Sequence, residues 1–149
     1  MQTRIFQTQT ELSAPIDRVF QFFADASNLE RITPPWLRFR IISPTPIDIR
    51  EGSIIDYRLR VRGFPIRWRT VIESWDPPHA FVDRALRSPY RLWRHTHTFE
   101  PSENGVRMTD RVEYAPPLAC ITDPLFVRRE IERIFEYRRL IIQSVFPAR

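Results

Sequence analysis

The chain has 149 residues, a net charge of +5 at pH 7 and 42% hydrophobic residues, a composition that fits one folded domain over residues 1–149. It contains no lysine, one cysteine and three glycines. These counts exclude an intrachain disulfide, a lysine Schiff base and a glycine-rich phosphate loop, and no segment approaches the ~20 apolar residues of a membrane span.

The N-terminal part of the chain predicts one strand and two short helices. Residues 5–12 alternate apolar and polar side chains, as in a half-buried strand. An apolar stripe at helical spacing occupies residues 16–23. A second brief helix has Asp25 and Ser27 as capping candidates and must end at the prolines of positions 34 and 35.

The middle of the chain predicts strands in succession. Alternating stretches, separated by glycines or prolines, give six further strands at residues 37–41, 53–62, 66–73, 80–86, 91–99 and 106–114.

The C-terminal part predicts one long helix over residues 122–146. Thr122 and Asp123 are capping candidates, and Pro124 suits the first helical position. Apolar residues from Val127 to Val145 form one stripe, and we place the arginines and glutamates, Arg138 among them, on the opposite side. The resulting fold class is α+β, with a curved seven-stranded antiparallel sheet, two short helices between the first two strands and a long helix across one face. Such a helix cannot fill all the space over a curved sheet, so we expect a cavity there.

The strand at residues 91–99 carries two of the three histidines. Alternation places His95 and His97 on one face together with Trp93 and Phe99. If the next strand pairs with it, Asp110 shares that face and could orient an imidazole. The histidines are then polar points in a ligand cavity, a structural hydrogen-bonding network, or a catalytic acid-base group, and the residues alone leave these alternatives open.

A metal site at His95 and His97 would need a third ligand, which Asp110 could supply. The sequence shows neither an open cleft nor supporting groups around the pair, so we predict no metal and no cofactor. We expect Asp83 to form an ion pair with an arginine of a neighbouring strand.

Many arginines fall on the strand faces opposite the apolar residues: Arg58, Arg60, Arg62, Arg67, Arg69, Arg94, Arg107 and Arg111. That face lacks interleaved aromatics for stacking on bases, so we predict a solvated surface and no specific nucleic-acid binding. The lone Cys120 fits a reducing, cytoplasmic setting.

Several stretches carry a family resemblance that covers nearly the whole chain. They are residues 12–15, 28–36, 63–68, 89–99, 110–114 and 134–138. Together they resemble the START-like superfamily, also called Bet v 1-like or SRPBCC, and within it a bacterial cyclase/dehydrase-like subgroup. The resemblance implies a helix-grip fold with a ligand cavity, and implies no particular reaction because the superfamily contains enzymes and non-enzymes.

We therefore predict a domain that binds a small apolar or aromatic molecule, lipid-like or polyketide-like, between the sheet and the C-terminal helix. The alternative is a cyclase or dehydratase that uses His95 or His97 with Asp110 as an acid-base group. The predicted ligand-binding residues are Tyr57, Leu59, Trp68, Ile72, Trp93, Phe99, Met108, Val112 and Tyr114.

Overall fold

A computed structural model describes residues 2–61, 63–117 and 124–147. Its elements, in chain order, are β1 (Arg4–Leu12), α1 (Ile16–Ala24), α2 (Asn28–Ile32), a 3-10 turn η1 (Pro35–Leu37), β2 (Arg40–Ile41), β3 (Ile54–Val61), β4 (Phe64–Asp76), β5 (Ala80–Arg87), β6 (Leu92–Ser102), β7 (Gly105–Ala115) and α3 (Pro124–Val145). The expected caps at Thr122 and Asp123, as well as Cys120 and Arg62, lie outside the described residues.

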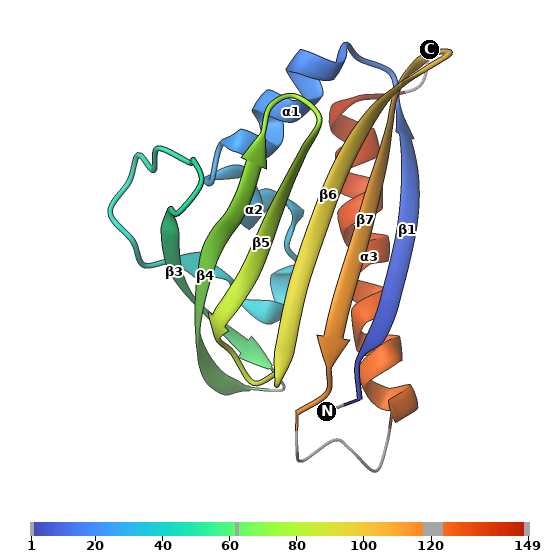
Figure 1. The fold of residues 1–149 in the computed structure, drawn as a ribbon. Helices are drawn as coiled ribbons and strands as arrows, with labels where there is room; N and C mark the ends of the chain where they lie inside the picture. Colours follow the sequence, from blue (N-terminus) through green and yellow to red (C-terminus); the bar gives the residue numbers. More distant parts are fainter. Residues whose placement is uncertain (1, 62, 118–123, 148–149) are drawn as a thin grey trace.

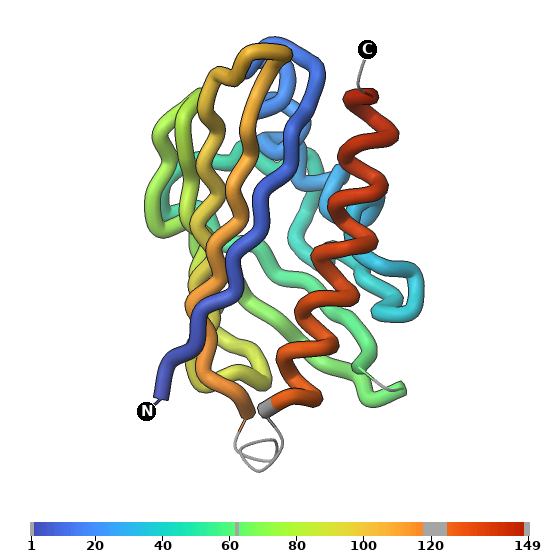
Figure 2. The backbone as a smooth tube through the Cα atoms, turned by 90° about the vertical axis from the view of Figure 1, so that its right-hand side faces the viewer, coloured from blue at the N-terminus to red at the C-terminus, as the bar shows by residue number. Residues whose placement is uncertain are grey.

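The seven strands form one antiparallel sheet in the order β1-β7-β6-β5-β4-β3-β2 (Figure 1). Each strand from β2 to β7 pairs with the next along the chain, and β1 closes the sheet beside β7. The long helix α3 crosses the concave face of the curved sheet, as the side view shows (Figure 2). The predicted helix-grip fold is confirmed. None of the helices in the described part of the chain has the length and apolar character that crossing a bilayer requires.

The register between β4 and β5 is irregular. It shifts between Arg69 and Thr70, where β5 has the extra residue, and again between Ile72 and Ser74, where β4 has it. A bulge of this kind adds a residue on one strand and increases the local bend and twist. The second shift also reverses the alternation, so Ile72 and Trp75 both turn inward.

The helices cover only part of the concave face. One buried cluster lies beneath α1 and includes Phe20, Phe23, Phe99 and Met108. Another lies beneath the first half of α3 and includes Phe6, Val112, Tyr114, Ile131 and Phe135. Because α3 packs mainly against β1 and α2, and α1 against β6 and β7, the inner surface of β3 to β5 is the part of the sheet that the helices of the described residues cover least.

The second strand is shorter than the sequence pattern predicts. Residues 35–37 form the turn η1 instead, and Arg38 follows in a left-handed conformation with φ 48°. This conformation breaks the alternation expected from residue 37 onward, since a strand needs extended backbone at every position. Only Arg40 and Ile41 pair with β3.

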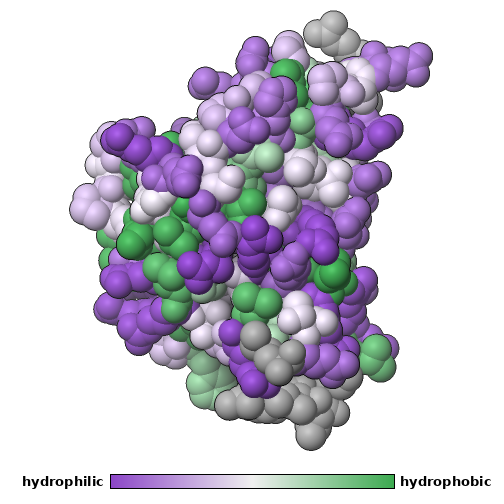
Figure 3. Space-filling model, in the orientation of Figure 1, coloured by the Kyte–Doolittle hydropathy of each residue, from purple (hydrophilic) through white to green (hydrophobic). Residues whose placement is uncertain are grey.

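Polar side chains dominate the outer face of the sheet, which faces the reader in Figure 3. Several of the predicted outward arginines form ion pairs with carboxylates of other strands: Arg69 with Asp56, Arg94 with Glu73, and Arg107 with Glu11. The predicted solvated face therefore carries exposed ion pairs.

Candidate functional site

A cavity of about 220 Å³ lies between α3 and the uncovered inner surface of the sheet. Most of its lining is apolar or aromatic, with contributions from α2, η1, β3 to β6 and α3. A few polar side chains reach into it from opposite sides: Tyr57 and Thr70 on one side, and Asp83, His95, His97 and Arg138 on the other. Apolar walls with a few convergent polar groups are typical of small-molecule sites.

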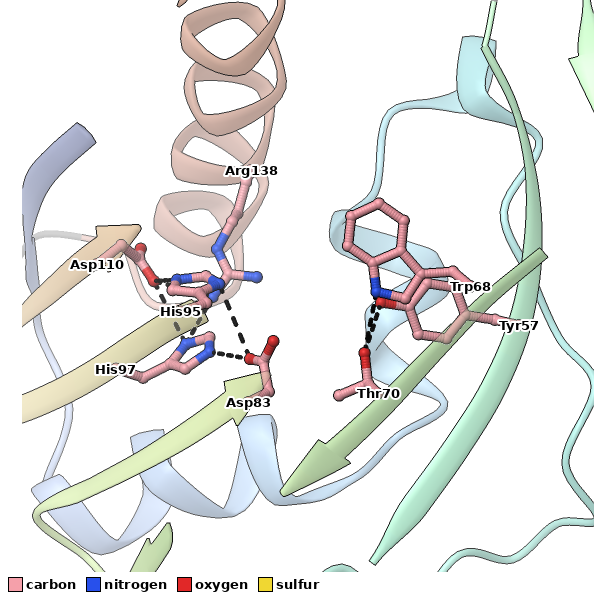
Figure 4. A network of polar contacts seen from close by, with 8 residues as sticks. All are labelled: Tyr57, Trp68, Thr70, Asp83, His95, His97, Asp110 and Arg138. Carbon is pink, nitrogen blue, oxygen red and sulfur yellow. Dashed lines mark hydrogen bonds and ion pairs between the residues drawn. The ribbon is translucent and has the colours of Figure 1, made fainter. Parts of the chain in front are cut away.

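Strands β5, β6 and β7 bring two carboxylates and two imidazoles together (Figure 4). In the sheet register Asp83 lies directly opposite His95, and His97 directly opposite Asp110. The short hydrogen bonds run diagonally: His95 Nε2 lies 2.7 Å from Asp110 Oδ1, and His97 Nε2 lies 2.6 Å from Asp83 Oδ2. Because an ionised carboxylate only accepts, each histidine donates its Nε2 hydrogen. The two rings stack with centroids 3.6 Å apart.

The C-terminal helix adds a cation to this group. Arg138 is 8% exposed, and its Nη2 lies 3.3 Å from Asp110 Oδ1 and 3.4 Å from His97 Nδ1. Figure 4 shows its guanidinium entering the space between the two polar sides of the cavity. Its Nε is buried and has no hydrogen-bond partner among the described residues. We call Asp83, His95, His97, Asp110 and Arg138 the polar cluster.

Both carboxylates of the polar cluster stay ionised. Burial by itself would raise the pKa of Asp110, but the charge of Arg138 and hydrogen bonds from the two histidines hold that pKa well below its usual range. Burial also opposes ionisation of Asp83, but the hydrogen bond from His97, together with the nearby charges of the histidines and Arg138, outweighs it, so the pKa of Asp83 is lowered too. Two negative charges therefore face one guanidinium.

His95 is held in its neutral form. Burial, followed by the neighbouring His97, lowers the pKa of His95 to about 4, although Asp110 and Asp83 act in the opposite direction. At neutral pH His95 donates its Nε2 hydrogen to Asp110. Its Nδ1 is an acceptor and lies 3.9 Å from Asp83 Oδ2. His95 can thus accept a proton or a hydrogen bond at Nδ1.

The opposite wall holds a smaller hydrogen-bonded group. Trp68 Nε1 donates to Thr70 Oγ1 at 3.0 Å, and the Tyr57 hydroxyl lies 3.1 Å from the same oxygen. Burial raises the pKa of the Tyr57 phenol, so this hydroxyl remains protonated. The rings of Tyr57 and Trp68 stack, and Trp93 meets Trp68 edge-on with centroids 5.5 Å apart.

The structure separates the predicted ligand-binding residues into two sets. Five of them line the cavity: Tyr57, Leu59, Trp68, Ile72 and Trp93. Four are not part of its lining, because helices α1 and α3 cover that end of the sheet: Phe99, Met108, Val112 and Tyr114. These four are buried core residues, and their expected position on the cavity wall is corrected.

Sequence reasoning missed two members of the polar cluster. We predicted that Asp83 pairs with an arginine of an adjacent strand. This prediction is wrong for the described residues, in which the close partner of Asp83 is His97. The stripe pattern predicts Arg138 on the polar side of α3, whereas its side chain points inward. Its spacing held a signal, because it lies three residues after Phe135 and four before Ile142, both buried on the inner stripe.

Three members of the polar cluster have the residue types of a metal site. Ligand atoms of Asp83, His95 and His97 lie within 4.8 Å of one another. They already hydrogen-bond within the cluster, and the guanidinium of Arg138 lies beside them, where it would repel a cation. The residue types of a metal site are therefore present, but the neighbouring guanidinium disfavours a cation there.

The chain matches a protein family described as polyketide cyclase / dehydrase and lipid transport over residues 3–139. It belongs to this family. No sequence among the curated proteins matches it significantly.

Solved structures of other proteins share this fold at low sequence identity. Protein CV1439 from Chromobacterium violaceum is 15% identical, with a TM-score of 0.76 and 97% of this chain and 99% of that chain covered. The Zhui aromatase/cyclase from Streptomyces sp. R1128 is 14% identical, with a TM-score of 0.74 and coverages of 96% and 93%. Ginseng major latex-like protein 151 from Panax ginseng is 12% identical, with a TM-score of 0.72 and coverages of 97% and 98%. At these identities the likeness concerns the fold.

Proposed function

We propose that this family member binds a small apolar or aromatic molecule whose polar end meets the polar cluster. The observation that carries the proposal is the buried guanidinium of Arg138, which borders a mostly apolar cavity and leaves its Nε without a partner in the described chain. A buried donor without a partner costs free energy, and an acceptor oxygen on a ligand would recover it. The family description, which includes lipid transport, supports a hydrophobic ligand.

The cavity limits the size of the ligand. Its volume of about 220 Å³ lies below the roughly 300–1,000 Å³ of pockets that hold drug-sized molecules. We therefore favour a molecule of one or two rings, or a short chain, with one oxygen function. The stacked Tyr57 and Trp68 rings and the nearby Trp93 provide the apolar side of the site.

The matched probes are 1-naphthol and naphthalene, which differ by one hydroxyl group. Quenching of tryptophan fluorescence reports their binding, because Trp68 and Trp93 line the cavity. We expect 1-naphthol to bind roughly tenfold tighter, since one hydrogen bond to a charged group contributes about 1.5–3 kcal/mol. Arg138→Met should abolish this difference, whereas Arg129→Met, at an exposed position of the same helix, should preserve it. Absence of saturable binding of either probe would reject the proposal.

A second candidate function is cyclisation or dehydration of a polyketide-like substrate. It is favoured by two imidazoles that face the cavity and are each oriented by a carboxylate. Neutral His95 could take a proton from a carbon next to a carbonyl, and Arg138 could stabilise the resulting oxyanion. The test is mass spectrometry of a synthetic short poly-β-ketone incubated with the wild type, His95→Gln and His97→Gln. Turnover that disappears in a variant that still binds would replace the binding proposal with the enzymatic one.

Two wider expectations belong to the same proposal. We infer a cytoplasmic location from the single cysteine of the sequence, since a reducing setting suits a free thiol. We also infer that nucleic acid is not a specific partner, because several outer arginines are paired with carboxylates of other strands. Cell fractionation tests the location.

A further inference from the structure

A second hollow adjoins the cavity. It has a volume of about 740 Å³ and lies between the α2–η1 connection and the residues of β2 and β3. Four arginines line it: Arg38, Arg40, Arg58 and Arg60. We call it the arginine groove.

The arginine groove carries positive charge without matching carboxylates. Its one acidic side chain is Glu30, whose Oε1 accepts a hydrogen bond from the Ile41 backbone N–H at 3.2 Å. Among the described residues, no carboxylate lies within ion-pair distance of the four groove arginines. Arginines elsewhere on the same sheet, such as Arg69 and Arg107, do have such partners.

The sheet register brings like charges together at this edge. Arg40 lies directly opposite Arg58, and Arg58 lies directly opposite Arg67 on the next strand. Like charges directly opposite each other destabilise a sheet. A bound anion would remove this repulsion, and the guanidinium fork matches the oxygens of a carboxylate or a phosphate.

The groove and the cavity are neighbours. Thr33, Phe39 and Leu59 line both of them. Phe39 packs against Tyr57 with ring centroids 4.6 Å apart, so one aromatic side chain lies between the charged space and the apolar one. A single molecule could therefore place an anionic group in the groove and an apolar part in the cavity.

We propose that the arginine groove binds the anionic group, carboxylate or phosphate, of an amphiphile whose apolar part enters the cavity. This inference rests on the proposed function for the apolar part and adds a second contact point for the same ligand. The cavity alone selects for an apolar body with an oxygen function, whereas the groove selects for negative charge.

The test compares octanoate, octyl phosphate and octanol, which share one apolar chain, by calorimetry with the full chain. We expect both anions to bind roughly tenfold or more tighter than octanol, since a charge-assisted hydrogen bond is worth about that factor. The double variant Arg40→Gln/Arg58→Gln should remove this preference and leave octanol affinity unchanged. The matched control Arg69→Gln/Arg107→Gln changes paired arginines of the same sheet and should keep the preference.

Inorganic phosphate as a competitor distinguishes the sources of the anion. Competition with octyl phosphate and not with octanol would support a groove that recognises the anion itself, and a preference between octanoate and octyl phosphate would name the headgroup. Equal affinity for all three octyl probes would overturn the inference and leave the cavity proposal standing. A preference that survives in the groove variant would overturn it as well. A third outcome is that phosphate binds to the wild type and not to the groove variant, while no octyl probe binds; the anion site then stands and the cavity proposal fails. Absence of binding by every probe, phosphate included, rejects both proposals.

Discussion

Arg138 Nη2 lies 3.3 Å from Asp110 Oδ1, and this contact joins the C-terminal helix to the centre of the sheet. Both side chains are buried, so each charge depends on the other. We expect Arg138→Met to lower the free energy of unfolding by about 3–5 kcal/mol, because the substitution leaves buried carboxylates without a cation. Urea unfolding measures the change, with Arg129→Met as an exposed control on the same helix.

Asp110→Asn should compensate in part for the loss of Arg138. The double variant Arg138→Met/Asp110→Asn removes both charges of the contact, so its loss should be smaller than the sum of the two single losses. Strictly additive losses would mean that the two charges do not stabilise one another.

Stability should depend on pH through His95. Burial lowers its pKa from 6.5 to about 4, so between these values the unfolded chain binds a proton that the folded chain does not. The free energy of unfolding should therefore fall as pH drops from 6.5 towards 4, by about 3 kcal/mol from this group. The lowered pKa values of Asp83 and Asp110 add a further loss of stability at still lower pH. Urea unfolding at several pH values between 7 and 4.5 measures this change in the free energy of unfolding.

The free energy of unfolding should depend less on pH in His95→Gln, whereas His79→Gln should show the same pH dependence as the wild type. His79 lies at an exposed position outside the polar cluster, so it serves as the control. A slope that is unchanged in His95→Gln would assign the pH dependence to another group.

The hydroxyl of Thr70 hydrogen-bonds two buried side chains on the opposite wall. Thr70→Val should cost about 1–3 kcal/mol, because Trp68 Nε1 and the Tyr57 hydroxyl both lose their partner oxygen. It should also weaken binding of naphthalene, since the rings of Trp68 and Tyr57 line the cavity and would lose the bonds that orient them. Thr98→Val, at a half-buried position on β6, is the matched control. Equal losses for the two variants would contradict the role given to Thr70.

Gly105 closes the hairpin between β6 and β7 in a conformation that no other residue fits. Its φ is +152°, and an added Cβ would overlap the carbonyl oxygen of Leu12. Gly105→Ala should thus lower the free energy of unfolding by about 3 kcal/mol, through backbone strain and a steric clash. Gly52→Ala, with φ +88° and open space around the Cβ position, should cost only about 1 kcal/mol. Thermal and urea unfolding of both variants compare the two costs.

Nucleic-acid binding should be weak and sensitive to salt. The net charge of +5 and the exposed arginines allow an electrostatic contact with phosphates. We expect gel shifts of a duplex oligonucleotide to vanish by roughly 0.2 M salt, because counterion release no longer favours such contacts. A shift that persists above this concentration and depends on the oligonucleotide sequence would contradict the expectation.

The sequence by itself determined which side chains share a face. Alternation along residues 91–99 and 106–114 placed His95, His97 and Asp110 on one side of the sheet, and the structure has them there within hydrogen-bond distance. The order of strands and helices along the chain, including the long C-terminal helix, also followed from local patterns. Such features depend on residues close together in the chain, through the period of the strand or helix and the breaks at glycine and proline.

Only the tertiary structure decided what covers that face and which partners meet there. Phe99, Met108, Val112 and Tyr114 have the right alternation for a cavity wall, but α1 and α3 pack directly on them. The contacts from His95 to Asp110 and from His97 to Asp83 join β5, β6 and β7, and the contacts of Arg138 depend on where α3 lies over the curved sheet. These arrangements depend on packing between residues far apart in the chain, including the register shifts between β4 and β5, so local periodicity alone could not fix which partners meet.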